Sequence, residues 1–385
     1  MTYIDPHTGK PKTWTQIDLA KRLGVSEVTV RLMETPNKGL DSIERRRLLA
    51  DLLKIPPALF GLASLINLQN ELKPPQTVIR STTPLLNSDT IKLYRDAFSV
   101  YSQMHVIGTA QDALPDIEQW ITKIQKDMVD VPNSQSKELL GIKWSFHALC
   151  AKIYGEDICN WSGAFDHLNT SLEIATSLQS ADLQAASLYR ASAVHIAQKN
   201  FALAKTELDG ALLYAQSAQT HIKGAVFAAD AALAHALATT DIAGITSAQR
   251  LLDQAEKYVD HPFDDGVMNF SEGKYQLIKA RTLLTLNRTG KALECLDDAE
   301  AGINQRERRR LAILNIFRAE CYIKMKRPEY DTALLLLVDA FTTSSDIHST
   351  FNVKHIKRLY KTLKASNYGA SPQVADLGLL LREQR

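Results

Sequence analysis

The sequence predicts an all-α protein in which a short N-terminal pair of helices precedes a long array of helical hairpins. Residues 13–35 contain two short amphipathic stretches joined by a glycine turn. Farther along, a pattern of small residue, leucine and small residue recurs at intervals of 40, 44, 44 and 41 residues. Between these two regions lies a polar stretch interrupted by prolines, which is typical of a domain boundary.

Length and composition favour a water-soluble chain with more than one folding unit. The chain has 385 residues, and single cores stop growing at about 250–300 residues. Apolar residues make up 45% and charged residues 23%, and no apolar run reaches the roughly 18 residues expected of a membrane span. The first twenty residues lack the apolar core of a secretory signal. We therefore expect a cytoplasmic protein that does not bind membranes.

The net charge of +2 is unevenly distributed. Residues 1–62 contain ten Lys and Arg against seven Asp and Glu, whereas the rest of the chain contains 35 against 36. This distribution favours a small basic module attached to a nearly neutral body.

The N-terminal segment has the signals of two consecutive short helices. Thr15 is positioned to cap the first helix, and Gly24 supplies the left-handed residue that ends it. Ser26 is the next candidate cap. The expected packing positions are Ile17, Leu19, Ala20 and Leu23 on the first helix and Val28, Val30 and Met33 on the second. Two short helices joined by such a turn form a helix-turn-helix unit.

The stretch "TQIDLAKRLGVSEVTVRLME" resembles the phage repressor and Cro-like (Xre) regulators. The similarity continues through a further expected helix at residues 41–53 and the segment "LLKIPPALFGL", so we assign residues 1–62 to a helix-turn-helix DNA-binding domain. The family's usual first helix is replaced by "YIDPHTGKPK", whose prolines and glycine indicate turns.

The resemblance implies roles for six residues in binding double-stranded DNA. Gln16 would contact a phosphate and Lys38 the DNA backbone, while the residues facing the major groove would be Ser26, Glu27, Val28 and Arg31. Glutamate can accept a hydrogen bond from cytosine, and an apolar side chain can contact the thymine methyl group. The alternative is a helix-turn-helix that serves packing or dimerisation without DNA.

Residues 63–88 form the expected linker, because Pro74, Pro75 and Pro84 exclude a long helix. Residues 89–385 form the expected repeat domain. Its recurring triplets are Ala164/Leu168/Ser171, Ala204/Leu208/Ala211, Ala248/Leu252/Ala255, Ala292/Leu296/Ala299 and Ala333/Leu337/Ala340. Each triplet lies on one helical stripe. Earlier helical runs at 182–198, 221–238, 270–286 and 308–326 make each unit a helical hairpin, with further pairs near 90–126 and 351–382.

These triplets resemble the core of tetratricopeptide (TPR) repeats, whose usual period is about 34 residues. The longer period implies a degenerate variety, and other helical repeats of similar period remain open. The resemblance implies a right-handed TPR-like α-solenoid with a concave groove. The combination of both domains resembles the RRNPP group of bacterial peptide-sensing regulators. It implies a homodimer that recognises a short peptide, or another peptide or protein ligand, in the groove and so controls DNA binding in quorum sensing.

Alignment to the repeat motif predicts that the groove-facing residues are Lys152, Tyr189, Asp230, Arg281 and Glu320. The alternative is that these are ordinary solvated or inter-helix groups. The run "QRERRRL" at 305–311 is a basic cluster that is typical of a solvated helix start, with partner binding as the less common explanation.

No constellation of residues predicts catalysis, and we expect neither a metal nor a cofactor. The four cysteines form no CxxC pair and are expected to be buried small hydrophobes. The sequence thus predicts a non-enzymatic transcription regulator, with a scaffold whose domains bind only proteins as the alternative.

Overall fold

The computed structural model describes residues 2–4, 11–13, 15–33, 49, 86 and 88–383, except for 109, 130, 238–241, 261–262, 265–267 and 305–306. The chain divides into two compact units, Met1–Ser81 and Thr82–Arg385. The expected linker spans this division, but only residues 86 and 88 of it are described. Lys38 lies outside the described residues, as does the expected helix at 41–53 apart from the buried Leu49.

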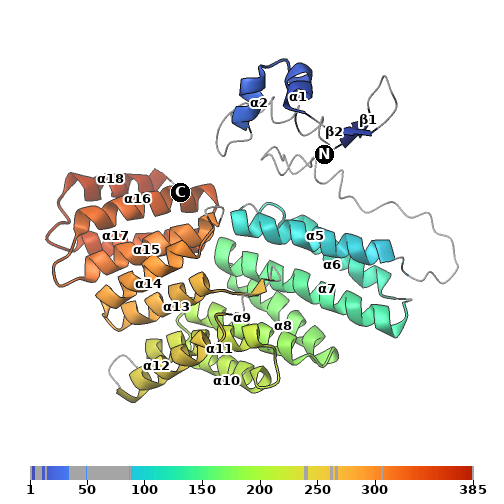
Figure 1. Cartoon of the computed structure of the whole chain (residues 1–385). Helices are drawn as coiled ribbons and strands as arrows, with labels where there is room; N and C mark the ends of the chain where they lie inside the picture. Colours follow the sequence, from blue (N-terminus) through green and yellow to red (C-terminus); the bar gives the residue numbers. More distant parts are fainter. Residues whose placement is uncertain are drawn as a thin grey trace. The chain divides into compact units, whose positions relative to one another are not determined.

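In the N-terminal unit a small hairpin precedes two short helices (Figure 1). Strands β1 (Thr2–Ile4) and β2 (Pro11–Thr13) pair antiparallel, with Tyr3 opposite Lys12. The sequence predicted only turns here, and the strands form because the chain on either side of the Pro- and Gly-containing segment is extended and can pair with itself.

Helix α1 (Gln16–Leu23) and helix α2 (Glu27–Met33) lie where the sequence predicts them. The Asp18 amide donates to Thr15 Oγ1 at 3.1 Å, and the Asp18 carboxylate accepts from Thr15 in return, so a capping box begins α1. Gly24 ends the helix with φ 63°. Ala20 and Val30 are buried. Val28 was also expected to pack, but it is 67% exposed, and Ile17 is 52% exposed, because the short helices bury only a narrow stripe.

The second unit consists of helical hairpins in sequence order (Figure 1). Helix α5 (Ser88–Ile107) is followed by α6 (Leu114–Asp127), and α7 (Asn133–Lys152) packs on α8 (Trp161–Ser177). The central hairpins pair α9 (Ala181–Ala197) with α10 (Phe201–Ala215), and α11 (Thr220–Leu237) with α12 (Ile242–Glu256). The later ones pair α13 (Glu272–Thr285) with α14 (Thr289–Ala301), and α15 (Arg308–Lys324) with α16 (Tyr330–Asp346). Helices α17 (Thr350–Lys364) and α18 (Pro372–Glu383) close the chain.

Every residue of the five predicted triplets is buried, with at most 3% of its surface exposed. The triplets lie on α8, α10, α12, α14 and α16, the second helix of each hairpin. Alanine at these positions lets neighbouring helices approach, and leucine fills the space between them. The one polar member, Ser171, donates to the carbonyl oxygen of His167 at 2.9 Å, so its hydroxyl group is satisfied. The all-α class is therefore confirmed, and the strands of the described residues are two or three residues long.

One of the two short hairpins lies inside the array. Strands β3 (Phe263–Asp264) and β4 (Asn269–Phe270) pair antiparallel between α12 and α13. Phe270 and Met268 are buried against the central hairpins, and Phe270 fills the space left by Gly224 on α11. The segment is thus a packed element of the core.

The first and last parts of the repeat unit meet one another. Helix α5 packs on α15, and α17 packs on η2, a π-helix (Ile153–Ile158) that continues α7. Gly108, at the end of α5, has φ 92° and touches the side chain of Ile347 after α16. Lys354 on α17 lies over the ring of Trp161 on α8, with its Nζ 5.8 Å from the ring centroid. Segments that are about 150–250 residues apart in the chain therefore contact one another within this unit.

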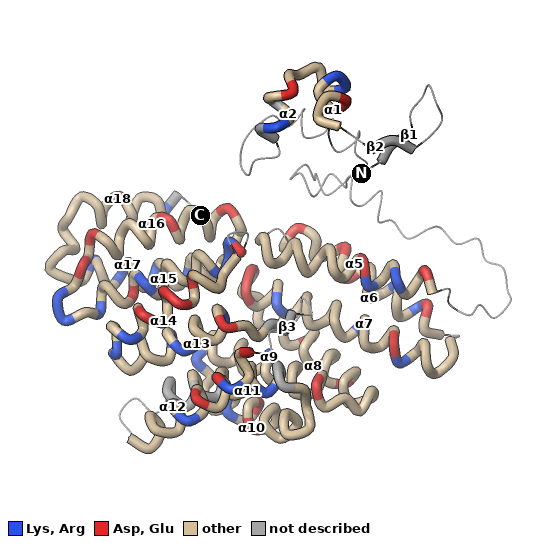
Figure 2. Tube along the Cα trace, in the orientation of Figure 1, with Lys and Arg blue, Asp and Glu red and all other residues tan. Residues whose placement is uncertain are grey.

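Charged residues of both signs are interspersed over the helices of this unit (Figure 2). None of the described helices is long and apolar enough to cross a membrane.

Candidate ligand-binding cavity and candidate DNA-facing helix

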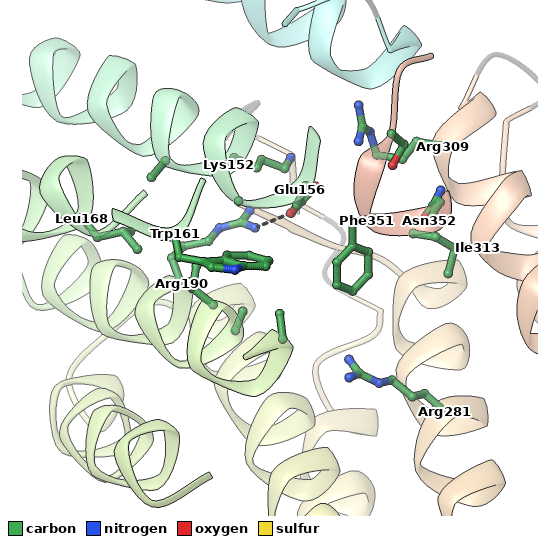
Figure 3. A pocket seen from close by; sticks show the side chains of 16 residues that line it. Lys152, Glu156, Trp161, Leu168, Arg190, Arg281, Arg309, Ile313, Phe351 and Asn352 are labelled. Atoms are coloured by element: carbon green, nitrogen blue, oxygen red, sulfur yellow. Dashed lines mark ion pairs between the residues drawn. The ribbon is translucent and has the colours of Figure 1, made fainter. Parts of the chain in front are cut away.

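A cavity of about 230 Å³ lies where the two parts of the repeat unit meet (Figure 3). One wall comes from α7, η2, α8 and α9, and the other from α13, α15, α17 and Ser349 just before α17. Trp161 and Phe351 are its aromatic residues, and Leu168, Val194 and Ile313 add aliphatic surface. The polar residues of the wall converge from both sides and are Lys152, Glu156, Arg190, Arg281, Arg309, Ser349 and Asn352.

The π-helix η2 positions the acidic side of the cavity. It extends α7 without a break and ends at Cys159, whose φ is 56°. Because a π-helix is wider than an α-helix, it changes the direction in which successive side chains point. Glu156 then lines the cavity, while the adjacent Asp157 is buried beside it.

Two ion pairs cross from η2 to the surrounding helices. Arg190 Nη1 lies 3.6 Å from Glu156 Oε1, and Arg309 Nη1 pairs with Asp157 Oδ1. The Asp157 side chain is 2% exposed and that of Arg309 is 9% exposed. His105 of α5 lies 3.4 Å from both Glu156 Oε2 and Asp157 Oδ2. Three helices distant in sequence, α5, η2 and α15, are therefore joined by one cluster of ionisable side chains, in which His105, Asp157 and Arg309 are buried.

Some hydrogen-bond donors of cavity residues remain unmatched. Among the described residues, Arg309 Nε and Nη2 and Asn352 Nδ2 are buried without a hydrogen-bond partner. Because leaving a buried donor unsatisfied costs about 1–3 kcal/mol, such groups are uncommon in proteins unless they have a role.

The electrostatic environment of the cavity is cationic. Burial, followed by the positive charges of Arg190, Arg310 and Arg309, lowers the pKa of Lys152 to about 8, although Glu156 acts in the opposite direction. Burial also places the pKa of Lys274, on α13, well below its usual range, with contributions from Arg190 and Lys152. Adding an anion would relieve this repulsion.

The structure brings together two of the residues predicted to face ligand. Lys152, at the end of α7, and Arg281, on α13, both line the cavity from opposite walls (Figure 3). Neither side chain forms a hydrogen bond or an ion pair with another residue in the described part of the chain.

The other predicted ligand residues lie elsewhere. Tyr189 is 6% exposed in the hydrophobic core, where Arg190 and Lys274 both lie 5.8 Å from its ring centroid. Glu320 is buried between α15 and α17. Asp230 belongs to α11, but its side chain lies outside the described residues.

Glu320 is held by two cations and a histidine rather than exposed to a groove. Lys324 Nζ lies 2.7 Å from its Oε1, and His355 Nε2 and Arg358 Nη2 lie 3.1 and 3.3 Å from its Oε2. Burial opposes ionisation, but hydrogen bonds from His355 and Lys324 lower the pKa of Glu320 to about 2. These contacts match the alternative stated for the predicted ligand residues, in which Glu320 is an ordinary group between helices.

The basic run at 305–311 differs from the expected solvated helix start. Arg308 pairs with Asp346 at 2.6 Å, Arg310 pairs with Glu307, and Arg309 is buried against Asp157. Arg309 was therefore not among the residues predicted to line a ligand site, although the basic run itself was the available signal. The sequence contains no comparable signal for Asn352 or Glu156. These residues line the cavity only because helices distant in the chain pack together.

In the N-terminal unit, four of the residues predicted to contact DNA lie on one exposed segment. Ser26, Glu27 and Val28 are exposed at the start of α2, and Arg31 is exposed in its last turn. Arg31 Nη2 lies 3.5 Å from Glu27 Oε1, an i, i+4 pair that holds both side chains along the helix. Gln16 is partly buried at the first position of α1.

In the described part of the chain, no group of His, Cys, Asp or Glu is arranged to hold a metal ion. Three of the cysteines are buried, and Cys159 is half-buried. No protein-family model matches this chain, and a search of curated proteins finds no match.

Proposed function

We propose that this chain is a DNA-binding transcription regulator whose helical-repeat unit recognises a ligand. The observation that carries the proposal is the exposed face of α2, formed by Ser26, Glu27 and Val28 at its start and Arg31 in its last turn. The buried Ala20 and Val30 support this helix from behind. A short helix that packs by one face and presents its N-terminal residues has the geometry that enters a major groove. Arg31 supplies positive charge. Glu27 can accept a hydrogen bond from cytosine, and Val28 can contact the methyl group of thymine.

The repeat unit supports the sensing half of the proposal. Five hairpins with buried small-residue stripes suit TPR-like repeats in an α-solenoid, and the cavity between the ends of this array collects unmatched donors. A short peptide is the ligand that the resemblance to the RRNPP group implies. In this proposal the protein acts in the cytoplasm without catalysis, and ligand binding changes how a dimer presents its two α2 helices.

DNA binding is tested with the full chain and a library of random duplexes. Selected duplexes should give a retarded band in a gel-shift assay. Their affinity should fall as salt rises, because the cationic side chains of the bound protein displace counterions from DNA. The double variant Glu27→Ala, Arg31→Ala should bind the selected duplex at least about tenfold more weakly, since base contacts are worth about 1–3 kcal/mol each.

The matched control is the double variant Lys205→Ala, Asp209→Ala. These residues form an exposed i, i+4 pair on α10, with Lys205 Nζ 3.1 Å from Asp209 Oδ1. The control should leave DNA affinity unchanged. Equal binding by the α2 variant and the control would show that α2 is not the recognition helix. If no duplex is selected at all, the protein-binding scaffold is the better interpretation.

Dimerisation is tested by light scattering. One small module offers little surface for specific DNA affinity, so two modules should act together. The repeat unit, residues 82–385, offers more apolar surface for self-association than the N-terminal unit. A monomeric full chain would contradict the dimer and favour the scaffold.

A further inference from the structure

We propose that the cavity between α7–α9 and α13–α17 binds the carboxylate of a ligand that carries an apolar group next to it. This inference deepens the proposed sensing function and rests on it, because it names the chemical class that the repeat unit recognises. The ligand carboxylate would lie against Arg309, Lys152 and Asn352, and the apolar group against Trp161 and Phe351.

The charges of the cavity wall leave room for an anion. Arg190 is paired with Glu156 and Arg309 with Asp157. Lys152 and Arg281 have no such partner among the described residues, so the wall carries more positive than negative charge. Because like charges repel strongly in a partly desolvated site, an anionic ligand would stabilise this arrangement.

The unmatched donors have the geometry of a carboxylate site. Arg309 uses Nη1 for Asp157 and leaves Nε and Nη2, which lie on the same edge of the guanidinium plane, without a partner in the described part of the chain. Two parallel N–H groups on one edge match the two oxygens of a carboxylate. Asn352 Nδ2 adds a further buried donor from α17.

The size and remaining surface of the cavity limit the rest of the ligand. A volume of about 230 Å³ is below the roughly 300–1,000 Å³ of sites for drug-sized ligands. The ring systems of Trp161 and Phe351 lie across it (Figure 3), and Leu168 and Ile313 extend the apolar wall. A ligand with a single carboxylate and one aromatic or aliphatic group matches both the polar and the apolar part of the cavity wall. Such a carboxylate occurs in a small organic acid and at the C-terminus of a short peptide.

Lys152 makes the binding dependent on pH. Its pKa of about 8 reflects burial and repulsion from Arg190. The other charged groups that face it are Lys274 of α13, Arg309 and Arg310 of α15, and Glu156 of η2. A bound carboxylate favours the charged lysine, so affinity should be highest below pH 8 and should decrease as the pH rises through 8.

The experiment measures binding to the full chain by calorimetry with defined probes. The probes 4-phenylbutyrate and the dipeptide Leu-Phe each carry a free carboxylate, and 4-phenylbutyramide and Leu-Phe amide are their uncharged counterparts. At least one carboxylate should bind saturably, and its amide should bind about tenfold more weakly or worse, because charge-assisted hydrogen bonds are lost. Binding of the organic acid alone, or of the dipeptide alone, identifies the source and supports the proposal in either case.

Variants tie the binding to the cavity. Lys152→Met should weaken carboxylate binding by about tenfold and should also abolish the fall in affinity between pH 7 and 9.5. Arg281→Gln should weaken carboxylate binding less than Lys152→Met, because Arg281 contributes positive charge from the opposite wall without contacting the carboxylate. Lys143→Met is the control, because Lys143 lies on the same helix α7 but donates to Gln125, away from the cavity. These substitutions leave the buried Arg309–Asp157 pair intact, so circular dichroism should show folded protein.

Three outcomes would overturn the proposal: no binding of either carboxylate by folded protein, equal binding of acid and amide, or tighter binding of phenyl phosphate than of both carboxylates. The gel-shift assay of the same preparation needs no ligand. A failed carboxylate test with intact DNA binding would therefore reject this inference and leave the DNA-binding half of the proposed function standing.

Discussion

Removing one partner of the buried Arg309–Asp157 pair should destabilise the repeat unit far more than removing an exposed pair on the same helix. Asp157→Asn leaves the guanidinium of Arg309 nearly buried, at 9% exposure, without its counter-charge. Such a change costs about 3–5 kcal/mol. By contrast, Arg308 and Asp346 are 43% and 53% exposed, so Asp346→Asn should cost about 0–1 kcal/mol.

The measurement is urea unfolding of the full chain, followed by circular dichroism. With a slope of about 3 kcal/mol per molar urea, a loss of 3–5 kcal/mol lowers the midpoint by about 1–1.7 M. The double variant Asp157→Leu, Arg309→Met should recover most of the loss, because apolar residues can replace a buried pair without leaving a lone charge. Equal midpoints for Asp157→Asn and Asp346→Asn, or a double variant less stable than the single one, would show that burial of the pair does not make its loss costly.

Three further substitutions probe the core, the closure of the array and a buried histidine. Leu252→Ala, at a side chain only 1% exposed, should cost about 2–5 kcal/mol in urea unfolding, and an unchanged midpoint would contradict the assigned repeat register. Gly108→Ala should lower the midpoint because φ is 92° and a Cβ atom would overlap its neighbour, whereas Gly141→Ala, with nothing within 4 Å, should be neutral or slightly stabilising; equal effects would contradict the close approach. Burial holds the pKa of His147 at about 3, so the unfolded state binds more protons between pH 3 and 6.5, and this group should make stability rise with pH by up to about 1.4 kcal/mol per unit. The His147→Gln variant should show a correspondingly smaller slope, and an identical slope would contradict the burial.

The helices were predictable because their signals are local. The helical run expected at 308–326 corresponds to α15 at Arg308–Lys324, and the terminal pair expected at 351–382 corresponds to α17 and α18. A stripe of alanine and leucine indicates a buried helix face wherever it occurs, since burial depends on the composition of that stripe. The hairpin at the N-terminus was not predicted, because its strands are only three residues long, too short to show the alternating pattern of a strand, although the turn between them had clear signals.

The candidate cavity was only partly predictable, for a physical reason that Lys152 and Arg281 illustrate. Both were assigned to the concave side by repeat alignment, which locates a residue on its own hairpin, and both line the cavity. Repeat alignment does not predict which distant hairpins contact one another in the folded protein. Glu320 was assigned in the same way, yet it is neutralised by α17.

The closure of the array determines which charges are buried, and this is why the arginine run at the start of α15 was misinterpreted. An arginine run at a solvated helix start and one that forms a buried ion pair can have the same local sequence. They differ only in which residues of other helices lie opposite the run. Asp157, which lies opposite Arg309, is 152 positions away in the chain and is turned inward by a π-helix that the sequence did not indicate. Burial of the pair fixes one edge of the guanidinium and leaves the other without a partner in the described part of the chain. The contact that joins the two ends of the array is thus the same contact that creates the candidate carboxylate site, so variants of Asp157 should change stability and ligand affinity together, whereas Lys152→Met should change affinity alone.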